Sequence, residues 1–289
     1  MASWCLHLCS HLLYHTWDIL QNVTADKRTI PASNQAPGLQ FQRTIARRTW
    51  SKETTITTDY HLSVIIPAWN EENAIQGAID SAWLAGAEQV IVVDGGSNDR
   101  TAEIARTANC LLLQSDKGRG NQIAAGLLKA TAEFVMVLHA DSRLTGDVGQ
   151  ALSKVPAEVG WGCLEQEIEA PGWSYRVLEF GNGIRAKLFC LPYGDQAMWF
   201  RRSALERAGG FPALPLMEDV AVAQRLRNAS RPKILPVTTR TSARRWTAEG
   251  VVRRTLANWQ LLFRFLVLGH QAETLAKFYQ RQEQKKGND

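Results

Sequence analysis

Cysteine is scarce in this chain of 289 residues, which contains five cysteines, an odd number. No two of them form a CxxC pair, so neither a zinc ribbon nor a disulfide framework is indicated. Cys110, Cys163 and Cys190 are therefore expected to be small buried hydrophobic residues in a reducing compartment. We expect a cytoplasmic protein on this ground.

Long apolar runs are also missing. The run from Leu261 to Leu268 comes closest, but Arg264 interrupts it, and a transmembrane helix needs about 20 apolar residues. The wider segment 256–268, LANWQLLFRFLVL, has the helical apolar spacing that is typical of core packing. Peripheral membrane contact through this segment is the alternative.

Two common sequence signatures are absent. No GxGxxG fingerprint follows the apolar run that ends at Ile66, which speaks against an NAD-dependent oxidoreductase. No GxxxxGK[ST] string occurs, so the chain has no P-loop. A nucleotidyltransferase would place a Gly-rich, Arg-bearing loop directly after the same run, and that loop is missing as well.

Positive charge is only slightly in excess, with 33 Lys and Arg against 28 Asp and Glu, a net charge of +5. The chain has no stripe of basic residues interleaved with aromatic ones, so we expect no nucleic-acid partner. A mildly basic protein suits a small anionic ligand or a membrane surface.

The chain divides into segments of different character. Residues 1–60 are polar over much of their length and lack periodicity, so we interpret them as a disordered or targeting-like extension, with organelle targeting left open. From Leu62 onward, short apolar runs alternate with helical patterns. The expected strands are 63–66, 90–93, 111–113 and 134–138, and the expected helices are 72–83, 99–106 and 121–131. This alternation predicts an α/β fold with a parallel sheet.

The pattern changes after about residue 150. The expected strands are 160–168 (an edge strand), 197–201 and 233–237, and the expected helices are 173–189, 203–208, 218–227, 251–268 and 271–282. We therefore expect a domain over 61–248 with a nucleotide-binding half (61–150) and an acceptor half (151–248), followed by C-terminal helices (249–289).

Asp141 follows the apolar strand that ends in FVMVL, and ligands of open α/β sheets bind beyond the carboxyl ends of strands. It either binds a divalent cation on a diphosphate or caps the helix that follows. Asp94 ends another strand and could accept hydrogen bonds from a base or a ribose. In the alternative interpretation, Asp94 belongs to a turn that caps the next helix.

Other candidates lie in loops. Pro67, Trp69 and Glu71 offer a rigid turn, an aromatic face and a carboxylate to a nucleobase and ribose, or they simply start a helix. Lys117 and Arg119, flanked by glycines at a helix start, form either an anion site or a solvated basic turn.

The last two candidates lie near the C-terminal end. In Met217-Glu218-Asp219, one carboxylate could cap the helix and the other could act as a general base. The second candidate is Arg244-Arg245-Trp246. Its arginines could hold a diphosphate and its tryptophan could close the site, or the segment is a basic surface turn.

Taken in order, the strings PAWNEE, DGGSNDRT, GRGNQ, HADS, GDQ, MED and ARRW resemble the motifs of family 2 glycosyltransferases with the GT-A fold. The resemblance covers about Leu62 to Tyr279. More narrowly, the chain is similar to a small subfamily whose members accompany radical-SAM genes and are linked to arsenosugar biosynthesis. The resemblance implies an inverting transfer of a sugar from a nucleotide-diphosphate sugar to a hydroxyl acceptor. It implies a mostly parallel central sheet flanked by helices.

The resemblance also implies residue roles. Asp219 matches the acid of the ED motif and would be the base, and Asp141 matches the last acid of the DxD motif and would bind Mg²⁺ or Mn²⁺. The residues that would hold or lie near the nucleotide are Pro67, Trp69, Glu71, Asp94, Lys117, Arg119, Arg244, Arg245 and Trp246.

Two positions depart from the family pattern. His139 replaces the first acid of DxD, and Ser242 stands where processive synthases have glutamine, which argues against a polymer-making synthase. We expect acceptor specificity to reside in residues 160–200. A catalytically silent sugar-nucleotide-binding protein is the main alternative function, and an NAD-dependent oxidoreductase is the less favoured one.

Overall fold

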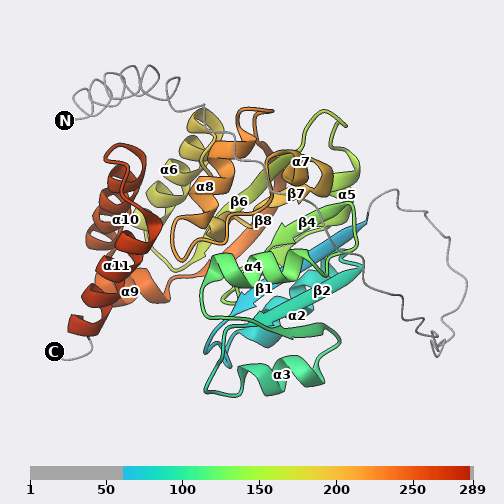
Figure 1. Cartoon of the computed structure of the whole chain (residues 1–289), viewed down its shortest axis with the longest axis horizontal. Coiled ribbons are helices and arrows are strands. Elements are labelled where there is room, and N and C mark those ends of the chain that lie inside the picture. The colour runs from blue at the N-terminus through green and yellow to red at the C-terminus, as the bar shows by residue number, and fades with distance from the viewer. Residues whose placement is uncertain (1–60, 287–289) are drawn as a thin grey trace, which may run out of the picture. The chain divides into compact units, whose positions relative to one another are not determined.

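The computed structural model describes residues 61–286 (Figure 1), and the expectations about residues 1–60 lie outside this range. The strands are β1 (Leu62–Ala68), β2 (Gln89–Asp94), β3 (Leu111–Gln114), β4 (Phe134–Val137), β5 (Ser142–Thr145), β6 (Trp161–Glu169), β7 (Trp199–Arg201) and β8 (Lys233–Ser242). The helices are α2 (Ile75–Leu84), α3 (Thr101–Thr107), α4 (Arg119–Leu127), α5 (Val148–Ser153), α6 (Trp173–Phe189), the 3₁₀ helix η1 (Gly194–Gln196), α7 (Arg202–Arg207), α8 (Glu218–Leu226), α9 (Arg244–Glu249), α10 (Val251–Leu266) and α11 (Ala272–Lys286).

The strands form one sheet of eight, in the order β3-β2-β1-β4-β7-β6-β8-β5. The first four strands pair in parallel, as do β6 and β8, whereas β7 runs antiparallel to both of its neighbours and β5 is antiparallel to β8. The predicted α/β fold class, a largely parallel central sheet flanked by helices, is confirmed.

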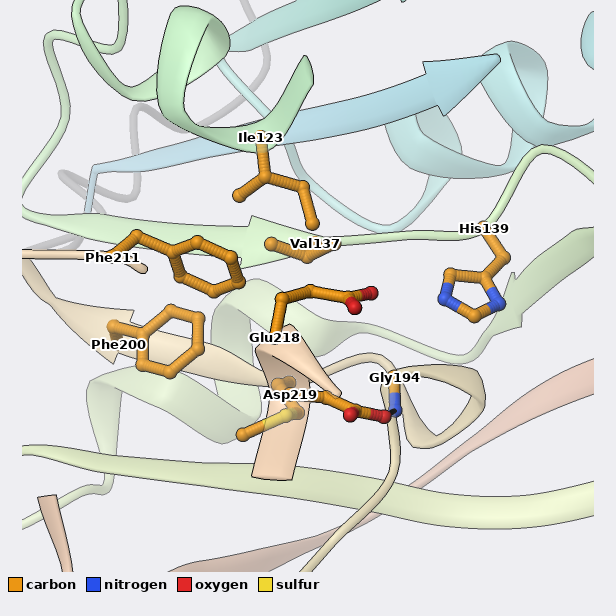
Figure 2. Close-up of a pocket in the computed structure, with 9 residues that line it drawn as sticks. Ile123, Val137, His139, Gly194, Phe200, Phe211, Glu218 and Asp219 are labelled. Carbon is orange, nitrogen blue, oxygen red and sulfur yellow. Dashed lines mark hydrogen bonds between the residues drawn. The ribbon is translucent and has the colours of Figure 1, made fainter. Parts of the chain in front are cut away.

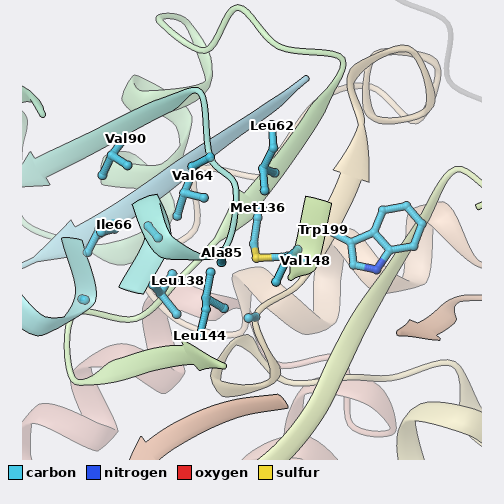
Figure 3. Close-up of a cluster of buried hydrophobic side chains, with 14 of the residues drawn as sticks. Leu62, Val64, Ile66, Ala85, Val90, Met136, Leu138, Leu144, Val148 and Trp199 are labelled. Carbon is cyan, nitrogen blue, oxygen red and sulfur yellow. The ribbon is translucent and has the colours of Figure 1, made fainter. Parts of the chain in front are cut away.

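Strand β1 is buried along its whole length because helices cover both faces of the sheet around it. Val64 and Ile66 pack into a hydrophobic cluster that includes α2, and Figure 3 shows this cluster continuing to Met136 of β4. Ile65 points to the opposite face and packs in a cluster that α4 covers. Successive strand side chains alternate between faces, so a continuous apolar run is what a two-sided strand requires.

The second half of the sheet has its own hydrophobic cluster. It joins Trp161 of β6 and Phe200 of β7 to Val220 and Leu226 of α8, and α6, α7 and α10 also contribute side chains. The two halves meet where β4 pairs with β7. Phe134 and Trp199 stack edge to face there, with ring centroids 5.8 Å apart, so the sheet and its core are continuous across the chain.

Several sequence expectations need correction. Residues 160–168 were expected to form an edge strand, but β6 lies between β7 and β8. Pro67 was placed in the loop after the first strand, but it is the sixth residue of β1 and pairs with Val93. Elements β5, α5 and α9 were not predicted, because each has only four to six residues and carries no clear period.

Within residues 61–286, no helix combines the length and the apolar content that crossing a bilayer requires.

Candidate active site

The loops that carry most of the candidate residues leave the carboxyl ends of β1, β2 and β4, which are adjacent in the sheet. Gln122 of α4 fixes two of these ends, because its side-chain amide donates to the carbonyls of Ala68 (2.7 Å) and Val93 (2.8 Å). The side chain is buried, and it adds a donor to the Ala68 carbonyl, which also accepts from the Gly95 N–H, and to the Val93 carbonyl. Gln122 thus holds the carboxyl ends of β1 and β2 together at the edge of the sheet where the candidate residues lie. We call this edge the rim.

Trp69 and Lys117 lie together at this rim. The Lys117 Nζ sits 3.1 Å from the centroid of the Trp69 ring, a cation–π contact. Trp69 remains 42% exposed. Trp69 and Lys117 are far apart in the sequence, and both were predicted to lie near a nucleotide. In the structure they form one exposed surface that combines an aromatic ring with a positive charge.

Arg244, at the start of α9, bridges two of the candidate carboxylates. Its Nη2 lies 2.7 Å and 3.1 Å from the two carboxylate oxygens of Glu71, and 3.7 Å from an oxygen of Asp141. The hydrogen bond to Glu71 is the main reason that the pKa of Arg244 is raised. The structure thus brings the β1 loop, the β4 loop and the start of α9 together around one guanidinium group.

Asp94 is placed differently. Its carboxylate is buried and accepts hydrogen bonds from the backbone N–H groups of Gly96 (3.2 Å) and Ser97 (3.1 Å), and from the Ser97 hydroxyl. Gly96 has φ +83°, which a residue with a side chain rarely adopts. Asp94 therefore shapes its own turn, and a direct ligand contact by this side chain stays a prediction.

A small pocket lies at the carboxyl end of β4 and is shown in Figure 2. Its apolar wall comes from Ile123, Val137, Met198, Phe200 and Phe211, and its polar residues are His139, Gly194, Glu218 and Asp219. In Figure 2 the carboxylate of Asp219 points toward the backbone nitrogen of Gly194, with the His139 ring nearby. The cavity itself is small, about 10 Å³, roughly the room for one water molecule, so its converging polar groups and not its size make it a candidate site.

The Asp219 carboxylate is held in a fixed orientation. One oxygen accepts from the Gly194 N–H at 2.8 Å and the other accepts from the Val220 N–H at 2.7 Å. Met217, just before α8, has φ +62°, a left-handed conformation that non-glycine residues adopt at some cost. This turn brings the start of α8, with both of its acids, up to the pocket.

Gly194 lies too close to the His139 ring to accept a side chain without a shift. An added Cβ would lie 2.7 Å from Nε2 of His139 and 3.6 Å from the Asp219 carboxylate. Burial lowers the pKa of His139 well below its usual value, and the nearby Arg119 and Arg245 add to the shift. The imidazole is therefore neutral at pH 7 and acts as a polar wall beside Asp219.

Glu218 and Arg119 form a largely buried ion pair beside the pocket, with Arg119 Nε 2.7 Å from the Glu218 carboxylate. Burial raises the pKa of Glu218, although Arg119 opposes this shift. The second Glu218 oxygen has no hydrogen-bond partner in the part of the chain that the structure describes. The sequence predicted Arg119 as a nucleotide-side cation, whereas here its guanidinium is engaged by an acid of the other half of the domain.

Sequence reasoning missed a polar cluster behind η1. Arg185 of α6 stacks on the Tyr193 ring (3.2 Å) and donates to Asn182 and Gln196, and Asn182 donates to Gln166 of β6. Gln166 in turn donates to Asp195, whose pKa burial raises. The signal in the sequence was Asn182 and Arg185, three residues apart and therefore on one side of the helix.

Trp246 and Arg245 occupy different environments. Trp246 is buried with Ile168 and Ala243 in a small hydrophobic cluster, so it anchors α9 from the inner side. Arg245 is exposed, and its charge influences His139. Ser242 accepts a hydrogen bond from the Arg244 N–H, which helps to start the same helix.

The donor set available for a metal ion is small. Among residues 61–286, no three His, Cys, Asp or Glu side chains gather closely enough to bind an ion by themselves. Asp141 is mostly buried, yet its carboxylate has Arg244 as a neighbour at the rim. A single carboxylate fits Mg²⁺ or Mn²⁺ when the phosphates of a substrate supply further oxygen ligands.

Comparison with known proteins shows which part of the chain has recognisable relatives. Residues 63–154, which hold β1 to β5, match the family model described as glycosyl transferase family 2. About a third of the chain therefore carries the sequence signature of that family, and this third contains the Trp69, Glu71 and Asp141 loops.

Curated relatives agree with this class. Over 94 residues the chain is 33% identical to an undecaprenyl-phosphate 4-deoxy-4-formamido-L-arabinose transferase of Pectobacterium atrosepticum, a match that covers 28% of this chain and 29% of that protein. It is 32% identical over 103 residues to an uncharacterized glycosyltransferase of Mycobacterium bovis (35% and 45% covered), and 30% identical over 111 residues to a dolichyl-phosphate beta-glucosyltransferase of Trichomonas vaginalis (32% and 34% covered). The chain thus spans less than half the length of each of these relatives.

Solved structures of similar proteins include S. aureus TarS 1–349 in complex with UDP, at 20% identity and a TM-score of 0.49, covering 63% of this chain and 60% of that one. Another is the mannosyltransferase PcManGT from Pyrobaculum calidifontis in complex with GDP-Man and Mn²⁺, at 19% identity and a TM-score of 0.49, covering 79% and 64%.

Proposed function

We propose that this protein is an inverting glycosyltransferase that moves a sugar from a nucleotide-diphosphate sugar to a hydroxyl acceptor, with Asp219 as the general base. The observation that supports this most is the convergence at the carboxyl end of β4. Asp219 and His139 line one pocket. Asp141, two residues after His139, and Glu71 both contact Arg244 at the adjoining rim. The match to glycosyl transferase family 2 points the same way. The narrower resemblance to the radical-SAM-associated subfamily stays a prediction.

The donor would lie along the β1 and β2 ends of the rim. Trp69 offers a flat aromatic face, and Lys117 places a positive charge 3.1 Å above it, which suits a base next to phosphates. Arg244 and Arg245 add positive charge where a leaving diphosphate gains negative charge. Pro67 and Asp94 would contribute by fixing the two loops.

Asp141 would be the protein ligand of a divalent cation, Mg²⁺ or Mn²⁺. When bound, such an ion neutralises negative charge on a leaving diphosphate. Arg244 has a second role in this arrangement: by contacting both Glu71 and Asp141, it holds the two loops at the spacing found here.

Asp219 would take the proton from the acceptor hydroxyl as that oxygen attacks the anomeric carbon from the face opposite the diphosphate. The N–H groups of Gly194 and Val220 fix the carboxylate, so it needs no reorientation during the reaction. Neutral His139 would form the pocket wall without adding a competing charge. The polar cluster of Gln166, Asn182 and Arg185 lies on the acceptor side, within the residues 160–200 where we expect acceptor specificity.

A thermal-shift panel of UDP- and GDP-sugars, with and without Mn²⁺, tests the proposal. We expect one nucleotide sugar to raise the melting temperature more with Mn²⁺ than without it, followed by release of the nucleoside diphosphate when acceptors are supplied. The acceptor set should contain hydroxyl acceptors and, for comparison, polyprenyl phosphates, because two relatives carry undecaprenyl phosphate and dolichyl phosphate in their names. A polyprenyl phosphate attacks through an ionised phosphate oxygen and would not need Asp219 as a base, so the two kinds of acceptor test different parts of the proposal. No stabilisation by any nucleotide sugar would exclude a donor site.

Replacing Asp141 by alanine tests the metal role. We expect Asp141→Ala to remove most of the Mn²⁺-dependent part of donor binding in calorimetric titrations, while binding without metal is retained. Asp116→Ala, which removes an acid near Lys117 instead, is the control and should titrate like the wild type. Unchanged metal dependence in Asp141→Ala would exclude Asp141 as the ligand.

A catalytically silent sugar-nucleotide-binding protein is the second candidate. It is favoured by one observation, that both Asp219 oxygens already accept backbone hydrogen bonds. The two candidates differ in turnover: binding of a donor without transfer to any acceptor, and without release of the nucleotide, would favour the silent protein.

A further inference from the structure

Helix α6 turns an apolar stripe toward the solvent. Trp173, Val177, Phe180, Ile184 and Leu188 follow one another at intervals of four, three, four and four residues, which places them on a single face of the helix. All of them are exposed, Trp173 by 78% and Phe180 by 70%. Soluble proteins rarely leave an apolar face of this length uncovered unless it serves contact.

Helix α10 repeats the pattern with the same intervals. Its stripe runs through Val252, Leu256, Trp259 and Phe263 to Val267 just beyond the helix end, and Leu256 is 64% and Trp259 61% exposed. The expectation that residues 256–268 pack into the core is therefore wrong for this face. Only Leu261 of this segment is fully buried, on the opposite side of the helix.

The inner sides of α6 and α10 belong to the same hydrophobic clusters. Ala186 shares one cluster with Leu262 and Phe265, and Leu178 shares another with Val251. Figure 1 places the two helices at the same end of the described unit, with α10 beside α11. We call the two outward stripes together the amphipathic face.

Positive charges accompany the amphipathic face. Arg176 and Lys187 on α6 and Arg253 on α10 are exposed, and each lies close to the apolar stripe of its helix. Helix α10 contains no acidic residue, and the one acid of α6, Glu179, is mostly buried and pairs with Arg176. Exposed charge on these two helices is therefore positive only.

We propose that the amphipathic face docks on the surface of a lipid bilayer that contains anionic headgroups. Exposed Trp, Phe and Leu side chains with flanking Lys and Arg are the composition of helices that lie in the interface plane of a membrane. The apolar stripes enter the boundary between headgroups and acyl chains, and the basic residues meet the headgroup phosphates. The helices lie on the bilayer without crossing it.

The same charges disfavour a second copy of the chain as the occupant. A two-fold dimer would press this face against itself. Lys187 and Arg253 of one copy would then meet the cations of the other, without an exposed acid on either helix to neutralise them. A bilayer with anionic lipids supplies the missing negative charge.

The amphipathic face is connected to the candidate site through the same helices. Helix α10 follows α9 directly, and α9 begins with Arg244. Helix α6 carries Arg185, whose guanidinium contacts Gln196 of η1 beside the pocket. Docking would therefore bring the acceptor side of the site close to the membrane surface, although the docking itself does not depend on the proposed reaction.

Vesicle flotation with the full chain tests this proposal without any activity measurement. We expect the protein to float with vesicles of phosphatidylcholine and phosphatidylglycerol, more weakly with phosphatidylcholine alone, and less as NaCl is raised. The variant Leu256→Ser/Phe263→Ser should bind about tenfold more weakly, because two apolar side chains no longer enter the lipid. The control Leu84→Ser/Leu128→Ser removes two exposed leucines, one in α2 and one just after α4, and should bind like the wild type.

A charge variant separates the two contributions. Lys187→Glu/Arg253→Glu should lose the preference for anionic vesicles and keep the weak binding to neutral ones. Absence of flotation, or flotation that is unchanged in the Leu256→Ser/Phe263→Ser variant, overturns the proposal. A concentration-dependent dimer in size-exclusion chromatography with light scattering, abolished by the same substitutions, would instead make this face an interface between two copies.

Discussion

Asp219 illustrates how much depends on the surroundings of a single side chain. Its sequence context, Met217-Glu218-Asp219, does not show how the two acids differ, and in the structure both line the pocket. In the structure, Glu218 is paired with Arg119 and Asp219 is fixed by two backbone N–H groups at the pocket wall. The two neighbouring carboxylates therefore lie in different environments: Glu218 is in an ion pair, and Asp219 accepts only backbone hydrogen bonds.

The variant Asp219→Asn should lose about 10²–10⁴-fold in turnover, because an amide cannot accept the acceptor proton. Donor affinity should stay the same, since the Asp219 carboxylate accepts hydrogen bonds from Gly194 and Val220 and is not part of the Trp69–Lys117 contact. Steady-state kinetics and calorimetry measure the two quantities separately. Asp80→Asn, on the surface of α2, is the matched control, and wild-type turnover in Asp219→Asn would remove Asp219 from the role of base.

The His139 ring leaves little room for a side chain at position 194. We expect Gly194→Ala to lower the free energy of unfolding by about 1–3 kcal/mol, because the new methyl group collides with the His139 ring and forces a shift. Gly181→Ala is the control: nothing lies within 4 Å of its added Cβ, and the helix should gain about 0.5–1 kcal/mol. Urea denaturation measures both. A stable Gly194→Ala would mean that the ring moves freely.

At the scale of elements, local sequence patterns were enough to predict the four parallel strands of the first half of the sheet, β1 to β4. The runs at β1, β2, β3 and β4 were predicted within a few residues. A buried parallel strand such as β1, β2 or β4 needs consecutive apolar residues, and the edge strand β3 was recognised from its short LLL run. Strand β5 was missed. Its sequence, SRLT, has an alternating burial pattern over only four residues and becomes a strand by pairing with β8.

The link between β1, β2 and α4 gives a test at this scale. Gln122→Ala removes the donor to the carbonyls of Ala68 and Val93, so we expect a loss of about 1–3 kcal/mol in the free energy of unfolding. Gln76→Ala removes an exposed amide of α2 that pairs only with Asp80, and it should change stability by less than about 0.5 kcal/mol. Chemical denaturation of both variants measures the two changes in the free energy of unfolding. If Gln122→Ala is as stable as Gln76→Ala, water replaces the hydrogen bonds of the Gln122 amide.

At the scale of the whole molecule, the two predicted halves are not independent in the described structure. The sheet runs through the β4–β7 pair, and β5, from the first half, closes the far edge by pairing with β8. The Arg119–Glu218 ion pair joins α4 to α8 across the same boundary. Residues 61–150 and 151–248 should therefore unfold in one cooperative transition.

Arg119→Met tests that connection. Removing the cation leaves Glu218 buried without its partner, so we expect the free energy of unfolding to fall by about 3 kcal/mol. The matched control is Arg100→Met, which breaks an exposed pair with Glu103 and should cost less than about 1 kcal/mol. Denaturation followed by far- and near-ultraviolet circular dichroism measures both. Two separate transitions in the wild type would contradict the cooperative interpretation.

The sequence by itself determined the α/β class, the strands of the first half and the positions of acids at strand ends, because these depend on side-chain periods of two and 3.6 residues. Only the tertiary structure decided which groups meet. Gly194 and Asp219 are 25 residues apart, Ser142 and Thr241 are 99 apart, and the exposure of α6 and α10 depends on which of their faces the sheet covers. Contacts of that kind arise from the packing of distant elements, and no local period records them.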